Sequence, residues 1–273
     1  MGLRINQNIA AQNAYRNLSV SDGQMSKQLE KLSSGFRINR AADDAAGLSI
    51  SEGLRSQVGG LKVATRNAQD AISVVQTAEG ALSEVTSMVQ RMRDLAVQSN
   101  SAAMDPAAKA ASQAEVTELA SEITRISQTT TFGTTKLLDG TFNGDFQVGA
   151  NTSTDDVLNV TIGAMDSATL GIDALQLDTA ANSTAAIDAL DTALTTITTQ
   201  RANLGASQNR FEHTINNLNT TVENLSASES RIRDADMATE MVSFTRSQIL
   251  TQAGTAMLSQ ANQSSQGVLS LLR

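Results

Sequence analysis

Asp43 and Asp44 are adjacent carboxylates whose residue type is suited to general acid–base catalysis. They lie in "SGFRINRAADDAAGLS", between two arginines, Arg37 and Arg40, and a run of small residues. Adjacent residues on a helix point about 100° apart, so these two carboxylates are poorly placed to share one proton or face one bond. We therefore expect a joint, in which the aspartates pair with Arg37 or Arg40 and begin a helix near Ala45.

His213 is the one histidine of the chain and the other residue suited to acid–base or metal chemistry. It lies two residues after Phe211, a member of a regular apolar row, and is therefore expected on the polar side of its helix. The sequence has no HExxH, G-x-S-x-G or P-loop motif, and the lack of cysteine excludes disulfides and thiolate zinc sites. No catalytic residue, metal ligand or cofactor is predicted, and the chain is not expected to be an enzyme.

The composition indicates which elements must carry the function. Aromatic residues make up 3% of a chain that is 40% hydrophobic, so the core must be aliphatic and thin, which favours long packed helices. The net charge of -8 argues against nucleic acid as a partner. Polar residues interrupt the apolar ones at the N-terminus and no stretch is long enough for a membrane span, so we expect neither a cleaved signal peptide nor a membrane partner.

Apolar residues alternate at spacings of three and four over most of the chain, which predicts long helices with narrow apolar seams. The seams are Leu18, Met25, Leu29, Leu32 and Phe36; Ile72, Val75, Leu82, Val85, Val89, Met92 and Ala96, with Ala78 or Glu79 between; and Ile187, Leu190, Leu194, Ile197, Arg201, Leu204, Gln208, Phe211, Ile215, Leu218, Val222 and Leu225. Arg201 and Gln208 interrupt the last seam and are expected to fix register and partner choice.

A break between helices is predicted at Asp105 and Pro106, because the aspartate can cap the next helix while proline takes its first position. The stripe of that shorter helix is Val116, Leu119, Ile123 and Ile126. Residues from about 130 to 182 are rich in Thr, Gly, Asn and Asp, and "FQVG" and "VLNVTI" between turn formers such as "DGTFNGD" predict hairpins.

The predicted fold class is mainly α: a long antiparallel helical bundle or coiled coil with small β-hairpins in the central region. We expect a terminal coiled-coil domain made of residues 1–43 and 234–273, and a helical rod domain of residues 44–233. Neither end can bury enough surface alone to offset its backbone entropy. Both ends are therefore expected to be mobile in the monomer and to become ordered by pairing with each other and with neighbouring copies.

A second row of residues beside the 72–96 seam consists of Met88, Arg91, Leu95 and Gln98. A helix needs one buried face inside its own bundle, so a second row with an exposed leucine suggests contact with another molecule. Alternatively, Leu95 only widens the apolar stripe, and the spacing alone does not separate these two interpretations.

Seven blocks of the sequence resemble bacterial flagellin and follow the order of that family. They are "LRINQNIAAQNA", "EKLSSGFRINRAADDAAGLSISEGLRSQ", "TAEGALSEVTSMVQRMRDLAVQS", "TFGTTKLLDG", "RANLGASQNRFEHTINNL", "SASESRIRDADMATEM" and "QANQSSQGVLSLLR". The resemblance implies a structural subunit that self-assembles into the flagellar filament for motility, with paired termini lining the filament channel. The centre is short, which implies a thin, smooth filament.

The resemblance also implies partners and a location. They are other flagellin subunits in a helical homopolymer, an export chaperone and the flagellar export apparatus, and the hook–filament junction and cap proteins. The subunit is expected outside the cell, in the bacterial flagellum filament, after export without a cleaved signal peptide. The alternative within the same system is a hook–filament junction protein. An amphipathic membrane-binding protein would need a basic face with bulky interfacial residues, which this acidic, Trp-free chain lacks.

Flagellins recognised by the animal innate receptor Toll-like receptor 5 have a receptor-contacting patch that also overlaps a contact between neighbouring subunits. The residues matching that patch are Gln90, Arg91, Leu95, Gln98 and Glu115. This sequence keeps those residue types, although "TELAS" differs from strongly stimulating members in the residues after Glu115. The resemblance therefore implies one surface with two binding roles.

Overall fold

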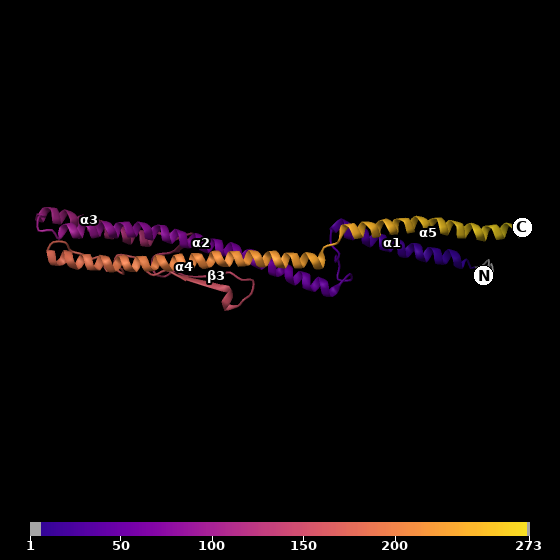
Figure 1. Cartoon of the computed structure of the whole chain (residues 1–273), viewed down its shortest axis with the longest axis horizontal. Helices are drawn as coiled ribbons and strands as arrows, with labels where there is room; N and C mark the ends of the chain where they lie inside the picture. Colours follow the sequence, from indigo (N-terminus) through magenta and orange to yellow (C-terminus); the bar gives the residue numbers. More distant parts are fainter. Residues whose placement is uncertain (1–6, 272–273) are drawn as a thin grey trace. The chain divides into compact units, whose positions relative to one another are not determined.

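The computed structural model describes the backbone of residues 7–271 and the side chains of residues 7–264 (Figure 1). Its elements are α1 (Ile9–Ser34), α2 (Ala45–Ser99), α3 (Pro106–Thr129), β1 (Thr131–Phe132), β2 (Thr135–Lys136), β3 (Asn143–Gln147), a 3-10 turn (Thr154–Asp156), β4 (Val157–Thr161), α4 (Ala180–Arg233) and α5 (Met237–Leu271). The predicted fold class, long helices with small central hairpins, is confirmed. The chain forms two compact units, one comprising Gln57–Glu223 and the other the residues up to Ser56 and from Asn224 onward.

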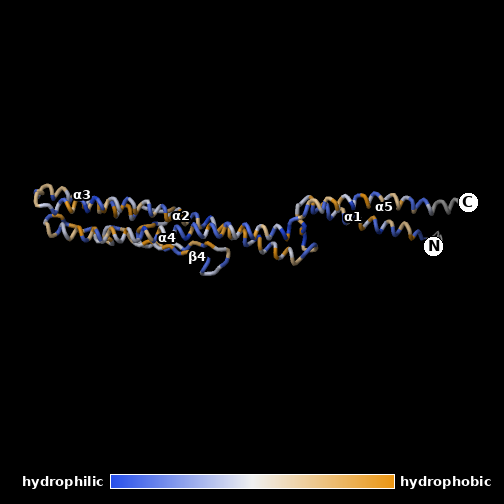
Figure 2. The backbone as a smooth tube through the Cα atoms, in the orientation of Figure 1, coloured by the Kyte–Doolittle hydropathy of each residue, from blue (hydrophilic) through white to orange (hydrophobic). Residues whose placement is uncertain are grey.

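The unit Gln57–Glu223 is held together by an aliphatic core along α2, α3 and α4. Hydrophobic residues recur along these helices in Figure 2, and the apolar residues of the predicted seams from Ile72 to Ile215 lie in the core or pack against it. The last three of the α4 seam, Leu218, Val222 and Leu225, lie outside this cluster. Ala78, rather than Glu79, fills the open place in the α2 seam. On α4 every seventh residue is buried: Leu190, Ile197, Leu204, Phe211 and Leu218. Each such side chain contributes about 1.5–3 kcal/mol by leaving water, so the seam is a main source of stability.

The two polar interruptions of the α4 seam behave differently. Arg201 Nη2 lies 3.5 Å from Glu79 Oε1 on α2, which joins the two helices across the seam. Gln208 instead donates from Nε2 to Glu212 Oε1 on its own helix, at 3.0 Å. A register role is therefore supported for Arg201 alone.

Two small antiparallel sheets lie in the middle of the chain, β1 with β2 and β3 with β4. In the larger one Phe146 is opposite Leu158, and the Phe146 ring packs edge-on against Phe211 of α4 with centroids 5.7 Å apart. Figure 1 shows this hairpin beside α4. The predicted hairpins are confirmed, but part of "DGTFNGD" is strand rather than turn, because β3 begins at Asn143.

In the other unit α1 and α5 lie side by side and antiparallel. No side chain of α1 is buried, and on the described part of α5 only Ser247 is. Lys31 Nζ of α1 forms an ion pair with Glu240 Oε1 of α5 at 3.2 Å, and Asn8 Nδ2 donates to the Ala261 carbonyl at 3.0 Å. The pairing of the two ends thus combines polar contacts with apolar residues that stay half-buried, such as Leu18, Met25 and Leu32 of the predicted seam.

The Asp43–Asp44 joint connects α1 with α2, but not through the expected ion pairs. Asp43 Oδ2 accepts hydrogen bonds from the backbone amides of Asn39 and Arg40 at 3.2 and 3.0 Å, and these donors lower the pKa of the carboxyl. The prediction that the aspartates pair with Arg37 or Arg40 is therefore wrong for these described residues. Arg40 Nε binds Glu30 at 2.8 Å, and Arg37 Nη2 donates to the Ile232 carbonyl at 2.6 Å.

Helix starts are capped as the sequence indicates. Asp44 Oδ1 accepts from the Gly47 amide at 2.8 Å at the start of α2, which occupies one of the amides that lack partners within a helix. Asp105 caps α3 by accepting from the Ala108 amide at 2.7 Å, and Pro106 is the first helical residue. The predicted helix break at Asp105 and Pro106 is confirmed.

Candidate interaction surface on α2 and α3

One ion pair joins the candidate contact residues of α2 to the candidate residue of α3. Arg91 Nε donates to Glu115 Oε1 at 2.7 Å, and both side chains are about half exposed. The hydrogen bond to Glu115 raises the pKa of the Arg91 guanidinium above its ordinary value by stabilising the charged form. Gln90 and Gln98, on the same helix as Arg91, are exposed. These four residues form a polar surface that we call the α2–α3 ridge: Gln90, Arg91, Gln98 and Glu115.

Leu95 does not belong to the exposed part of this surface. It is 3% exposed and lies in the hydrophobic core, while Met88, from the same row, packs half-buried against that core. Of the two interpretations left open by the spacing, the structure therefore agrees with the one in which Leu95 widens the apolar stripe, and not with an exposed leucine. Because α2 packs between two neighbouring helices, it needs a broad apolar face. A single row of residues identified from sequence spacing underestimates the width of that face.

Arg93 and Asp191 form a second clamp that the sequence analysis missed. Arg93 donates from Nε and Nη2 to the two carboxylate oxygens of Asp191 on α4, at 2.6 and 3.2 Å. Arg93 lies two residues after Arg91 and so points about 200° away around α2. The two arginines therefore hold α3 and α4 from opposite sides of α2. Because Arg93 and Asp191 are far apart in sequence, no local pattern could have paired them.

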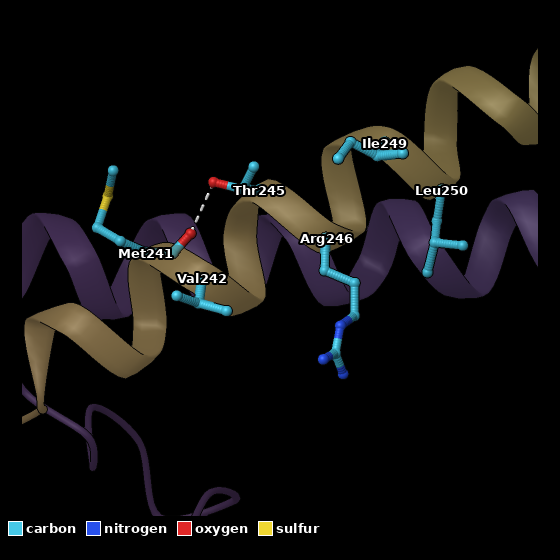
Figure 3. A pocket seen from close by; sticks show the side chains of 6 residues that line it. All are labelled: Met241, Val242, Thr245, Arg246, Ile249 and Leu250. Atoms are coloured by element: carbon cyan, nitrogen blue, oxygen red, sulfur yellow. Dashed lines mark hydrogen bonds between the residues drawn. The ribbon is translucent and has the colours of Figure 1, made fainter.

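A second exposed surface lies on α5, on residues that sequence spacing did not single out as a site. Figure 3 shows its six side chains along one stretch of the helix: Met241, Val242, Thr245, Arg246, Ile249 and Leu250. Thr245 Oγ1 donates to the Met241 carbonyl at 2.8 Å, so this hydroxyl is satisfied within the helix. Val242 and Ile249 are 63% and 60% exposed, which makes this α5 groove an unusually open apolar surface.

The described residues contain no arrangement suited to metal chemistry: nowhere among them do three His, Cys, Asp or Glu side chains meet. His213 is exposed on α4, on the polar side as expected. Within the described part of the chain, no helix combines the length and hydropathy needed to cross a bilayer. The candidate sites on the described residues are the two exposed surfaces above, the α2–α3 ridge and the α5 groove.

Comparison with known protein families identifies both ends of the chain. Residues 5–143 match the bacterial flagellin N-terminal helical region, and residues 187–272 match the bacterial flagellin C-terminal helical region. The unmatched centre, residues 144–186, contains most of β3 and all of β4. The chain therefore has the two family regions with a short segment between them.

Similar proteins span nearly the full chain. A flagellin from Halalkalibacterium halodurans is 52% identical over 270 residues, which cover 98% of this chain and 99% of that protein. A flagellin from Bacillus subtilis is 46% identical over 311 aligned residues, covering 99% of this chain and all of that protein. The flagellar filament 33 kDa core protein of Treponema phagedenis is also 46% identical, over 98% of this chain and 99% of that protein.

Solved structures agree with this assignment. The crystal structure of Bacillus cereus flagellin aligns with a TM-score of 0.50 and 29% identity, covering 60% of this chain and 94% of that one. A putative flagellar hook-associated protein from Vibrio parahaemolyticus aligns with a TM-score of 0.59 over 70% of this chain and 100% of that one, but its 10% identity concerns the fold alone. The chain belongs to the bacterial flagellins and is a short form without large outer domains, a structural subunit of the flagellar filament outside the cell rather than an enzyme.

Proposed function

We propose that this flagellin builds its filament by burying the apolar side chains of α1 and α5 against neighbouring subunits. The observation that carries the proposal is where the exposed apolar side chains lie. Along α1 and α5 they are Ile9, Tyr15, Val20, Leu29, Met237, Met241, Val242, Ile249, Leu250 and Met257. Within Gln57–Glu223 the large apolar side chains found exposed are Val63, Val97 and Phe132.

This distribution follows from the size of each core. The unit Gln57–Glu223 buries its seams internally, whereas α1 and α5 bury almost nothing against each other. Ordering a residue costs about 1–2 kcal/mol of backbone entropy, so a helix pair with so little burial gains much of its order from further contacts. A polymer of identical subunits supplies those contacts at every position along the filament.

Seeded polymerisation tests this role of the ends. The full-length chain is expected to extend filament seeds into thin, smooth filaments visible by electron microscopy, because the short centre adds no outer domain. A chain lacking about thirty residues at each end loses the helix pair and is expected to stay monomeric, although its core unit remains folded. Growth of the truncated chain at the full-length rate would contradict the proposal.

The exposed apolar side chains of α5 also support the proposal that the subunit has an export partner. Before polymerisation the α5 groove exposes side chains that favour self-association, so a dedicated chaperone is expected to cover α5 until the export apparatus takes up the chain. Hook–filament junction and cap proteins would contact the same terminal helices at the two ends of the filament.

The α2–α3 ridge is proposed as the surface that contacts the next subunit and Toll-like receptor 5. Support comes from the Arg91–Glu115 ion pair, which holds an arginine half-exposed between two exposed glutamines. An arginine in such a setting offers several donors to a partner at little cost in ordering. Leu95 acts from below, by filling the core beneath the ridge, rather than by direct contact.

Arg91→Ala tests the shared surface. It is expected to weaken receptor activation in reporter cells by about fivefold or more and to slow filament growth, because loss of a central arginine at an interface commonly removes more than 1 kcal/mol. Arg125→Ala is the matched control, since Arg125 also forms an exposed ion pair on α3, with Glu122. Equal effects of the two variants, or no effect of Arg91→Ala in either assay, would refute the ridge as the shared surface.

A further inference from the structure

Two segments of the chain are joined backbone to backbone where α1 leads into α2 and α4 leads into α5. The Arg37 amide donates to the Arg233 carbonyl at 2.7 Å, and the Ala235 amide donates to the Gly35 carbonyl at 2.9 Å. Phe36 and Asp234 thereby form an isolated antiparallel bridge. Gly35, which ends α1 at a φ of 74°, supplies the left-handed turn that leads into the bridge.

Arg233 fastens this bridge through its side chain. The guanidinium carbon lies 4.8 Å from the centroid of the Phe36 ring, a cation–π contact, and Nη1 binds Glu52 Oε1 on α2 at 2.7 Å. The Arg233 side chain is only 14% exposed, which places most of it out of water. We call Phe36, Glu52 and Arg233, together with the backbone bridge, the Arg233 clasp.

The contacts between α1 and α5 follow one antiparallel register that begins at the clasp. At one end of the pair Phe36 is opposite Asp234, and at the other end Asn8 is opposite Ala261, so the two chain segments run in opposite directions. Between these ends Lys31 meets Glu240. Farther along α1, Leu18 lies against Gly254, where an added Cβ would be 3.6 Å from the Leu18 Cβ.

The helix pair by itself has little that would select this register. Interlocking buried side chains normally fix the alignment of two helices. Here α1 buries no side chain and the described part of α5 buries only the small Ser247. The Lys31–Glu240 ion pair is partly buried, with side chains 28% and 16% exposed, but it does not select one register by itself. Lys27 lies one helical turn before Lys31 and lines the same surface as Glu240, so a slip of one turn would bring a second lysine to this carboxylate.

We propose that the Arg233 clasp sets the register of α1 against α5 and so determines which side chains α5 presents to a neighbouring subunit. The second half of this statement rests on the proposed function. The clasp has the features that the helix pair lacks: backbone hydrogen bonds that allow one alignment, and a largely buried arginine held by a ring and a carboxylate. A slip of one turn would move the α5 groove along α1 and alter the surface offered for assembly.

Engineered cysteine pairs measure this register directly, since the chain has no cysteine of its own. Leu18→Cys with Gly254→Cys places two Cβ atoms within disulfide range and reports the observed register. Leu18→Cys combined with Leu250→Cys or Leu258→Cys reports a slip of one turn in either direction. Each pair is oxidised briefly in the monomer, and the yield of intramolecular disulfide is compared.

The expected result depends on Arg233. With Arg233 present, the 18–254 disulfide should exceed both slipped pairs, and Arg233→Gln should reduce that preference about tenfold, as the loss of a cation–π contact and an ion pair predicts. Phe36→Leu should act in the same direction with a smaller change. Arg231→Gln is the matched control, because Arg231 lies two residues earlier on α4 and its Nε donates within its own helix, to Ala227. The Arg231→Gln variant should keep the wild-type preference for the 18–254 disulfide.

Several outcomes would overturn the proposal. One is that the 18–254 disulfide shows no preference over the slipped pairs when Arg233 is present. Another is that Arg233→Gln leaves this preference unchanged, and a third is that Arg231→Gln loses as much of it as Arg233→Gln does. The melting transition of the core unit serves as the folding check and should be the same in all variants.

Seeded elongation separates the clasp from the proposed function. On wild-type seeds Arg233→Gln should elongate about tenfold more slowly than Arg231→Gln, in proportion to the lost register preference. Altered crosslinking with normal elongation would overturn the link between register and the surface presented. Failure of the wild-type chain to elongate would count against the proposed function, while the crosslinking result would still decide whether the clasp sets the register.

Discussion

At the scale of single residues, charged side chains in this protein mainly tie helices together. Arg91 and Arg93 bind acidic groups on α3 and α4, Asp43 and Asp44 bind backbone amides, and Arg233 holds the joint of the terminal unit. Opposite charges at hydrogen-bond distance shift the pKa of each partner toward its charged form. Where a hydrogen bond lowers the pKa of a carboxyl, as at Asp43 and Asp191, its contribution to stability depends on pH in the direction of that shift.

Asp191 offers a test of this pH dependence. The hydrogen bond from Arg93 lowers the pKa of Asp191 below its ordinary value of 3.8. A lowered folded-state pKa gives stability that is present above pH 3.8 and is lost as the pH falls through the folded-state value. Asp191→Asn should therefore lower the melting temperature at neutral pH, and the difference from the wild-type chain should shrink below about pH 4.

Asp188→Asn is the control for that titration. Asp188 lies three residues earlier on α4 and is also exposed. Its replacement should leave the melting temperature nearly unchanged at every pH. A wild-type advantage over Asp191→Asn that persists undiminished at pH 2 would show that the Arg93–Asp191 pair is not its source.

At the scale of elements, the long helices could be predicted because their seams depend only on local spacing. The α4 row from Ile187 to Leu225 has no slip, and its buried members recur every seventh residue. The start of β3 at Asn143 could not be read in the same way, because a strand of five residues is defined by its partner β4 and by packing on Phe211.

The interaction surface was only partly predictable for a related reason. Residue spacing placed Arg91 and Gln98 on one side of α2, and the family resemblance added Glu115. The burial of Leu95 depends on how helices pack around α2, and the pairing of Arg93 with Asp191 joins helices that are distant in sequence. Neither the burial of Leu95 nor the Arg93–Asp191 pair follows from a local sequence pattern, so both could be identified only from the three-dimensional structure.

Phe211 is the element-scale position where a single change should matter most. It is the largest fully buried side chain of α4, 1% exposed, and it packs edge-on against Phe146 of the hairpin. Phe211→Ala should destabilise the unit Gln57–Glu223 by about 3–5 kcal/mol in denaturant unfolding, because it removes apolar area and leaves a cavity. Phe211→Leu should cost clearly less.

A matched control lies on the same helix. Leu194→Ala removes a half-buried residue of the same seam, and its cost should fall well below that of Phe211→Ala. Similar losses at the two positions would mean that stability is spread evenly along α4 instead of being concentrated where the hairpin packs.

At the scale of the whole molecule, the sequence divides its apolar residues between two tasks. The unit Gln57–Glu223 uses them for its own core, and the terminal helices leave them exposed, where we propose that other copies cover them. A monomer of this kind is part folded domain and part assembly segment. Stability measured on the monomer therefore reports mainly on α2, α3 and α4, and filament stability reports on α1 and α5 as well.

Amide hydrogen exchange on monomer and filament tests this division residue by residue. In the monomer α1 and α5 should exchange orders of magnitude faster than the seam residues of α2 and α4, because helices with few buried contacts open at low free-energy cost. In the filament the same two helices should become protected, while protection of the core seams changes little. The truncated chain provides the control, since its core amides should match those of the full-length monomer. Strong protection of α1 and α5 already in the monomer would mean that their mutual contacts suffice to fold them, and polymerisation would then join preformed surfaces instead of completing the fold.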